Sequence, residues 1–275
     1  MNSILDKTGL CYVLLNAIFY FIGFIKSPYL SEHDLYFGVF IEKGLPRLTG
    51  TTIDPNFAAL CLSFFSVYFF TRKNYFLFLF STILVVLTLS RSGMISLVLA
   101  ILFILLFTGS LLLKTRNIII IILVVLIFYI GVSFLDNNIL DEVLQKRTSG
   151  VESGAGRFDL WASALSFIYE RPLLGSGIFT FRDLYFKASG EARFAHNTFI
   201  EIATEVGILG FMIFLLFIIS LFNNVVKLSK NTYYRYMLPS FLLLVVMSNT
   251  LSIYINSVFA FFVIIFTYKD RKGGE

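Results

Sequence analysis

The chain has 275 residues, of which 57% are hydrophobic and only 14% are charged, and its mean hydropathy is +0.84. Soluble domains carry about a quarter charged residues, so this composition excludes an ordinary soluble enzyme. The net charge of +5 is explained by basic connections between apolar segments, so it predicts membrane topology and no nucleic-acid partner. Cys11 and Cys61 lie inside apolar segments and form neither a disulfide framework nor a metal-ligand spacing.

Eight apolar segments follow one another along the chain. They cover approximately residues 9–25, 57–70, 75–89, 93–113, 118–135, 198–222, 237–250 and 253–268. The second can extend back through Asp54-Pro55-Asn56, and the last two can form one kinked pair. A span needs roughly 20 apolar residues, and these runs are too long and continuous for barrel strands. The prediction is therefore an all-α fold, a single integral membrane domain (1–275) that is a polytopic bundle of about eight transmembrane helices.

Lysines and arginines orient this bundle. The first segment lacks a small-x-small cleavage site after its apolar run, so it is interpreted as an anchored helix. With the N-terminus in the cytoplasm, every short inner connection is basic, as the positive-inside rule requires. Both termini are then cytoplasmic, and the two long loops, 26–55 and 136–197, face outward. In a bacterium this is the periplasmic side of the inner membrane.

The outer loop at 136–197 is too long for a structureless connection in a compact protein, so it is expected to be functional. Within it, residues 158–169 have helical spacing, with Trp161, Leu165 and Ile168 on one face. We therefore expect an amphipathic helix that lies on the outer leaflet.

A glycine-rich turn follows this helix. Arg171 precedes Pro172 and ends the helix, since a residue before proline disfavours the α region. The next residues, Leu-Leu-Gly-Ser-Gly at 173–177, form a tight turn. Its glycines allow either positive φ in a plain turn or close approach to a ligand. Spacing alone favours the plain turn.

The sixth apolar segment begins with a histidine. His196 precedes Asn197, a good N-cap, and Thr198-x-x-Glu201 resembles a capping box. A histidine at this helix N-terminus suits general-base chemistry, because its unperturbed pKa lies near neutrality. Glu205 lies one turn beyond Glu201, about 12 Å into the span. It is either functional or a packing partner for an arginine or a backbone group.

Arginines form the second half of the candidate site. Arg47, Arg91 and Arg157 come from different outer segments. Guanidinium groups bind phosphate in a bidentate manner and stay charged, so converging arginines suit the pyrophosphate of a lipid carrier. For any one of them, snorkelling to the lipid headgroups is the commoner explanation. The outer aspartates form no Asp-x-Asp pair and no histidine cluster is present, so neither a metal nor another cofactor is expected.

In their order, these motifs resemble the bacterial O-antigen ligase and O-antigen polymerase superfamily. From about Arg47 onward, the resemblance rests on Gly50, Asp54-Pro55-Asn56, Ser90-Arg91-Ser92-Gly93, Gly156-Arg157, Trp161, the run from Arg171 to Gly177, His196-Asn197 and Glu205-Val206-Gly207. It implies an integral membrane glycosyltransferase that uses an undecaprenyl-diphosphate-linked glycan on the periplasmic face. It also implies no nucleotide sugar and no essential metal. Members usually have ten or more spans, so this chain resembles a short member without the N-terminal helices.

The resemblance also implies roles for individual residues. His196 takes the proton of the acceptor hydroxyl or orients the acceptor, while Arg157 and Arg91 neutralise the leaving diphosphate. The residues expected to bind substrate are Arg47, Arg171, Trp161, Asn197 and Glu205. The acceptor is a second lipid-linked glycan in a polymerase, or the lipid A core in a ligase. Membrane lipid is the remaining partner.

Two further hypotheses come from other classes of protein. A transporter or flippase of the same lipid-linked glycan favours inverted repeats and interrupted helices with polar residues near the midplane. No repeat is visible, and only the break near Asn249 and Asn256 points that way. The other hypothesis is a non-catalytic scaffold or an inactive, truncated member of the family.

Overall fold

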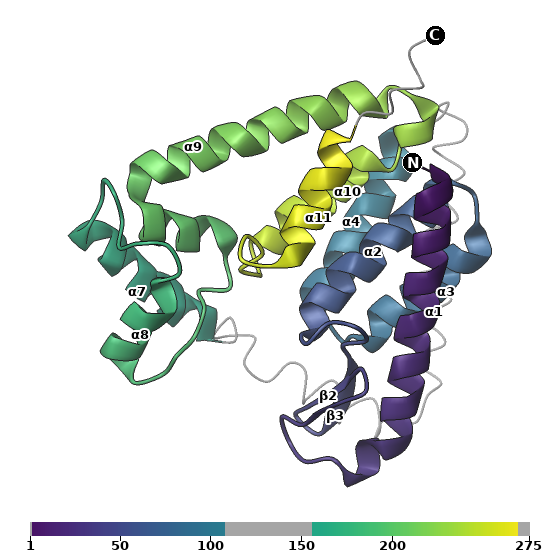
Figure 1. Cartoon of the computed structure of the whole chain (residues 1–275), viewed down its shortest axis with the longest axis horizontal. Coiled ribbons are helices and arrows are strands. Elements are labelled where there is room, and N and C mark those ends of the chain that lie inside the picture. Colours follow the sequence, from purple (N-terminus) through teal and green to yellow (C-terminus); the bar gives the residue numbers. More distant parts are fainter. Residues whose placement is uncertain (1, 108–155, 269–275) are drawn as a thin grey trace.

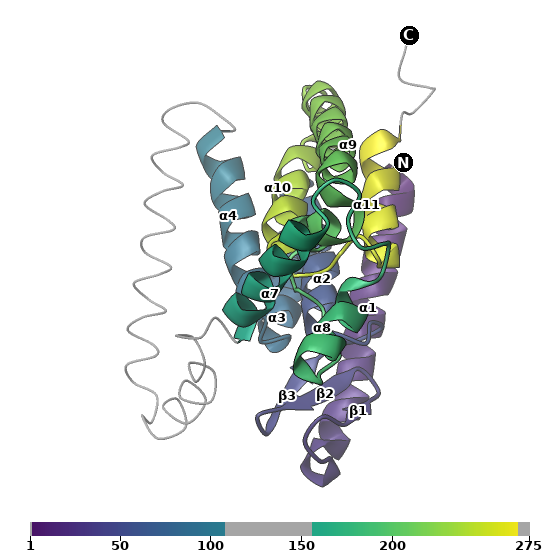
Figure 2. The ribbon, with the colours of Figure 1, turned by 90° about the vertical axis from the view of Figure 1, so that its left-hand side faces the viewer.

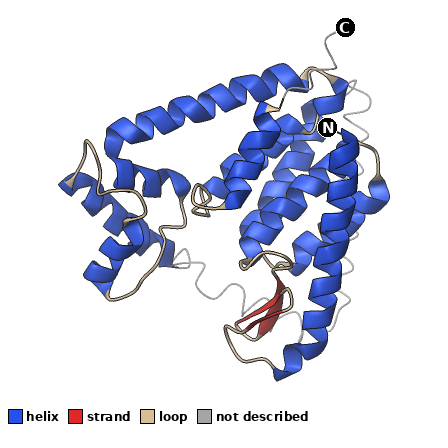
Figure 3. Ribbon diagram, viewed as in Figure 1, coloured by secondary structure: helices blue, strands red, loops and turns tan. Residues whose placement is uncertain are grey.

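The computed structural model describes residues 2–107 and 156–268 (Figure 1). The helix predicted at 118–135 and the part of the outer loop before residue 156 lie outside the described residues. The described chain is mainly helical, with one small sheet (Figure 3).

Every apolar segment predicted within this part of the chain forms a helix. The helices are α1 (Asn2–Lys26), α2 (Pro55–Thr71), α3 (Tyr75–Leu87), α4 (Arg91–Phe107), α7 (Arg157–Glu170), α8 (Phe181–Ser189), α9 (Thr198–Ser229), α10 (Met237–Ser248) and α11 (Ser257–Thr267), with 3₁₀ turns at Ser27–Tyr29 and Thr232–Tyr234. By length and composition, Ser3–Tyr29 and Thr198–Ser229 are long and apolar enough to cross a membrane. The other apolar helices are shorter, so the number of spans stays a prediction.

Helix α2 forms the centre of the bundle. It contacts α1, α3, α4 and α10, and it is buried along nearly its whole length. A helix that is apolar on all sides belongs in such a core rather than on a surface. The Phe64 ring packs edge-on against Tyr236, Phe261 and Phe262, which ties α2 to the C-terminal helices. Gly93 leaves room for Ala59, so α4 approaches α2 closely.

The first outer segment contains a three-stranded antiparallel sheet, which corrects the all-α prediction. Its strands are β1 (Leu35–Tyr36), β2 (Val39–Glu42) and β3 (Leu45–Leu48), and β2 lies in the middle. Alternate β2 residues, Val39 and Ile41, are buried beside α1. Strands this short leave almost no periodic signal in the sequence, so apolar-run analysis passes over them.

A second, smaller group of elements stands to one side of the bundle in Figure 1 and therefore in front of it in Figure 2. Helices α7 and α8 pack against each other and against α9, around a core of Leu160, Ala164, Phe167, Phe181, Tyr185 and Ala195. The helix predicted at 158–169 is confirmed, and Arg171 is its C-cap. Its packed side is formed by Leu160, Ala164 and Phe167, while Leu165, on the predicted apolar face, is 62% exposed. Helix α8 has no counterpart among the predictions.

Helix α9 is interrupted at Gly207, whose φ of 65° and ψ of −173° are not helical (Figure 1). The turn after α7 binds the backbone groups that this break leaves without helical partners. The hydrogen bonds run from Ser176 N–H to Thr204 O (3.1 Å), Gly177 N–H to Glu205 O (2.8 Å), Ile208 N–H to Pro172 O (2.8 Å) and Leu209 N–H to Leu173 O (3.3 Å). The Gly-rich turn therefore approaches the backbone of α9 closely and completes its hydrogen bonding.

Candidate functional site

A cavity of about 480 Å³ lies where the segment before α2, the segment before α9 and the α10–α11 connection meet. This volume is in the usual range of small-molecule sites, about 300–1,000 Å³. Its walls combine polar groups, among them Asp54, His196 and Asn256, with the aromatic rings of Phe57 and Phe194. The cavity can therefore take a ligand that has both hydroxyl groups and apolar faces.

The backbone around His196 is held on both sides. The Ala195 carbonyl accepts a hydrogen bond from Trp161 Nε1 (3.0 Å), and the Ala195 N–H donates to Glu201 Oε2 (3.0 Å). After the histidine, the Asn197 side chain caps α9: its Oδ1 accepts hydrogen bonds from the N–H groups of Phe199 (3.0 Å) and Ile200 (3.1 Å). His196 itself has a left-handed φ of 51°. These contacts fix the position from which the imidazole reaches the cavity.

The predicted N-cap is confirmed, but the predicted capping box is wrong. In a capping box the glutamate returns to the N–H of the N-cap residue. Here the Glu201 carboxylate accepts its hydrogen bond from the N–H of Ala195, not from the N–H of Asn197. The reason is spacing, since Asn197 is the cap and Glu201 lies one residue beyond the position that a capping box needs.

Two buried carboxylates lie beneath this segment. Glu201 and Glu205 are only 1% and 2% exposed. Tyr254 donates its hydroxyl to both, at 3.2 Å from Glu201 and 2.7 Å from Glu205. Glu201 also accepts from the Ser252 hydroxyl, and Glu205 from the N–H of Phe181 (3.2 Å). The carboxylates thus join the α10–α11 connection to α9 and α8.

Positive charge collects on the arginine side of His196. Arg157 begins α7 and Arg91 begins α4. Burial lowers the pKa of Arg157, and the nearby Arg91 charge lowers it further. Burial likewise lowers the pKa of His196, with Arg157 and Arg193 adding to the effect and Asp54 opposing it. Within residues 2–107 and 156–268, no carboxylate forms an ion pair with Arg91 or Arg157.

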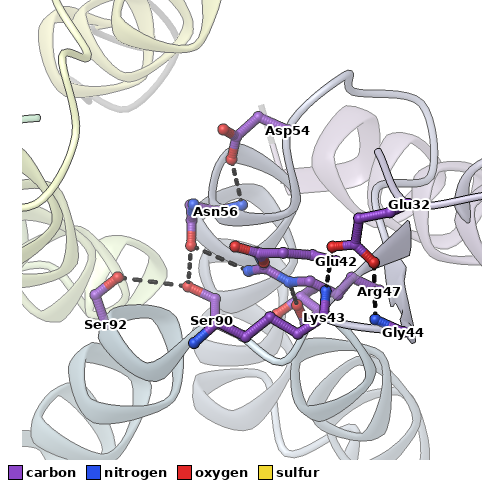
Figure 4. A network of polar contacts seen from close by, with 10 residues as sticks. Glu32, Glu42, Lys43, Gly44, Arg47, Asp54, Asn56, Ser90 and Ser92 are labelled. Carbon is purple, nitrogen blue, oxygen red and sulfur yellow. Dashed lines mark hydrogen bonds and ion pairs between the residues drawn. The ribbon is translucent and has the colours of Figure 1, made fainter. Parts of the chain in front are cut away.

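Arg47 belongs to a buried network that reaches the cavity-lining Asp54 through Asn56, as Figure 4 shows. It is 6% exposed, its Nε donates to the Thr88 carbonyl (2.9 Å), and its Nη1 pairs with Glu42. Asn56 Oδ1 accepts from Ser90 Oγ (2.7 Å) and from Arg47 Nη2 (3.5 Å). The network therefore joins the sheet to the starts of α2 and α4 and holds the predicted motifs there together.

The match to a family model decides what kind of protein this is. The model, described as O-antigen ligase, matches residues 76–215, just over half of the chain. The chain belongs to the O-antigen ligase family. The matched region contains Arg91, Arg157, the turn at 172–177, His196 and Glu205. No curated protein matches the sequence.

Membership in the O-antigen ligase family confirms the resemblance and the class of the protein. The family is membrane-integral and takes part in polysaccharide and lipopolysaccharide biosynthesis, with a glycosyltransferase-like activity. The apolar helices α1 and α9 agree with this.

The structure separates the site residues predicted for this O-antigen ligase family member into groups. Arg157 lies near both His196 and Arg91, and Trp161 and Asn197 support the backbone around His196. Glu205 lies below them, bonded to Tyr254 and the Phe181 backbone. Arg47 does not line the cavity, and its network reaches the cavity wall through Asn56 and Asp54. Arg171 is exposed at the end of α7, where its carbonyl accepts from the Gly175 N–H (3.1 Å).

No site role is predicted from the sequence for Asp54, Glu201, Asn256 or Phe194, although all four lie at or near the cavity. The local sequence predicts a capping role for Glu201 and a helix break near Asn256. Both assignments came from their local surroundings, which carry no information about a cavity formed by distant segments. Phe194 is one of 33 phenylalanines, so nothing in the sequence distinguishes it.

Proposed function

We propose that the chain transfers a glycan from undecaprenyl diphosphate to an acceptor sugar hydroxyl on the outer face of the inner membrane. The observation that carries the proposal is a cavity-lining histidine near Arg157, which in turn lies near Arg91. Neither arginine has a carboxylate partner in the described part of the chain. Family membership supports a polymerase-like or ligase-like reaction. The N- and C-termini are then cytoplasmic and the His196 side periplasmic.

The reaction is a direct displacement. The acceptor hydroxyl oxygen attacks the anomeric carbon of the donor glycan, and His196 takes the hydroxyl proton. The anomeric C–O bond to the diphosphate breaks, and undecaprenyl diphosphate leaves with the electron pair. A single displacement inverts the anomeric centre.

Each charged group has a defined part in this step. The lowered pKa of His196 keeps its imidazole neutral at pH 7, which is the form that accepts a proton. Arg157 and Arg91 face the charge that grows on the diphosphate. Preorganised donors of this kind are worth about 3–4 kcal/mol each.

The interrupted helix α9 does not argue for a transporter. Broken helices in transporters use their free backbone groups to bind substrates or ions. At Gly207, the carbonyls of Thr204 and Glu205 and the N–H groups of Ile208 and Leu209 are bonded to residues 172–177. The break in α9 is therefore occupied by the protein's own turn, which favours a transferase over a flippase.

The test is complementation of a deletion strain. His196→Ala and Arg157→Ala should abolish long glycan chains on a ladder gel while protein levels hold. Lys187→Ala, on the exposed face of α8, serves as the matched loss of a cation and should restore the wild-type ladder. Normal ladders from both site variants would reject the proposal.

The same gel separates the two chemistries. Without a polymerase, a single repeat still reaches the lipid A core. Without a ligase, the core receives none. The deletion strain alone therefore identifies which acceptor the protein uses.

A further inference from the structure

We propose that the cavity is the acceptor-sugar site and that Asp54 and Asn256 bind the acceptor's hydroxyl groups. This assignment rests on the proposed function and places the acceptor and the donor on different sides of His196. The acceptor enters the side of His196 that carries Asp54, while the donor diphosphate lies on the side of Arg157 and Arg91.

Asp54 has one oxygen available for this role. Its Oδ1 caps α2 by accepting from the Asn56 N–H (2.6 Å), while Oδ2 has no hydrogen-bond partner in the described part of the chain. The residue lines the cavity and lies close enough to His196 for its charge to affect the histidine. A carboxylate here repels a diphosphate but accepts a sugar hydroxyl.

Asn256 supplies the complementary donor. Its Oδ1 caps α11 by accepting from the Val258 N–H (3.0 Å). The Nδ2 amide group has no acceptor among the described residues, although Asn256 lines the same cavity as Asp54. A sugar hydroxyl both donates and accepts hydrogen bonds, so this acceptor–donor pair fits it.

Aromatic side chains complete the wall. Phe57 and Phe194 line the cavity, and the Arg182 guanidinium lies over the Phe194 ring at 5.7 Å from its centroid. Flat aromatic faces pack against the C–H faces of a sugar ring, while the hydroxyl groups at its edge reach polar partners. The cavity thus offers apolar packing and hydroxyl recognition beside the proposed base.

The two helix caps allow substitutions that preserve the fold. Asp and Asn cap helices about equally well, so Asp54→Asn and Asn256→Asp keep α2 and α11 capped. The first removes the free carboxylate charge and the second removes the amide donor. Asn231→Asp, at the cap of the Thr232–Tyr234 turn, is the matched control outside the cavity.

Trp161, the chain's only tryptophan, reports binding without catalysis. Its Nε1 bonds to Ala195, which lies between the cavity-lining residues Phe194 and His196. The probes for purified full-length protein in lipid nanodiscs are the repeat-unit oligosaccharide, released from lipid in the producing strain, and undecaprenyl diphosphate. Each is titrated while Trp161 fluorescence is recorded.

We expect Asp54→Asn and Asn256→Asp each to raise the half-saturating oligosaccharide concentration at least tenfold. Half-saturation by undecaprenyl diphosphate should stay within twofold, and Asn231→Asp should match the wild type for both probes. No saturable oligosaccharide response, unchanged oligosaccharide binding in both variants, or an equal loss for both probes would overturn the acceptor site. Intact ladders from His196→Ala and Arg157→Ala would instead reject the transfer reaction, so the two failures are distinguishable.

Discussion

At the scale of single residues, the site depends on how His196 is held and charged. Its backbone is fixed through the Ala195 peptide group, which both Trp161 and Glu201 bind. Its pKa is lowered mainly by burial and then by Arg157. A half-buried, neutral imidazole near cations suits a base that works near an anionic donor.

The first prediction concerns pH. A base is active when neutral, so kcat/KM should fall as pH drops through the lowered pKa of His196, below the ordinary histidine range. Arg157→Gln removes a positive neighbour, so it should raise this pKa and move the acid limb to higher pH. Asp54→Asn removes a negative neighbour that raises the pKa of His196, so it should move the acid limb of the profile to lower pH. Initial rates across a pH series test this, and limbs that coincide in all three proteins would contradict it.

The second prediction concerns Glu201. Glu201→Ala leaves the Ala195 N–H and the hydroxyls of Ser252 and Tyr254 without their acceptor. A buried unsatisfied group costs about 1–3 kcal/mol, so the variant should unfold at a lower temperature. The complemented deletion strain should then lack the glycan ladder. Glu201→Gln keeps one acceptor oxygen and should lie between the variant and the wild type. A thermal melt of detergent-purified protein that does not move in Glu201→Ala would refute this account.

At the scale of secondary-structure elements, the turn at 172–177 and the break in α9 form one unit. Gly175 and Gly207 both have positive φ, and a Cβ on either would collide with backbone atoms of the other segment. Their small size is needed so that the two backbones can exchange hydrogen bonds. The break in turn lets the first part of α9 pack on α7 and α8 while its remainder continues as an apolar helix.

The third prediction tests this unit with a matched glycine. Gly190 also has positive φ, but a Cβ there meets nothing within 4 Å. Gly190→Ala should therefore lower the free energy of unfolding only by the cost of placing a Cβ in a left-handed backbone conformation, about 1–2 kcal/mol. Gly175→Ala adds a backbone collision and should destabilise the protein clearly more, or prevent its accumulation. Thermal melts of the two variants compare these costs, and equal melts would show that the close approach is unimportant.

At the scale of the whole molecule, distant segments assemble the site. The cavity takes its walls from the segments before α2 and α9 and from the α10–α11 connection, while the arginines come from the starts of α4 and α7. The buried Arg47 network holds two of these starts together. Activity then depends on the packing of the bundle, and no single loop contains the site.

The fourth prediction is metal independence. Two arginines are proposed to supply the positive charge that stabilises the leaving diphosphate, so a divalent cation has no necessary part. Transfer by purified protein should keep its rate in EDTA. Loss of activity in EDTA that added Mg²⁺ restores would contradict this and would require metal ligands to be identified.

Much of the fold was readable from local signals. Apolar runs located the helices, Asn197 capped α9 as predicted, and Arg171 before Pro172 ended α7. These signals work because apolar length, capping and the restriction before proline act within a few residues of the chain. The order of the motifs was enough to indicate the family.

The tertiary structure decided which of these residues meet. It left Arg47 out of the cavity lining and Leu165 exposed, directed Glu201 to Ala195, and brought Asn256 into one cavity with the segment before α2. Local sequence signals were enough for the apolar helices and α7, for the cap of α9 and for the family. The cavity and the partners of its charged groups followed only from the packing of distant segments. The physical reason is range: caps and periodicity are local, whereas a cavity depends on close packing between segments far apart in the chain.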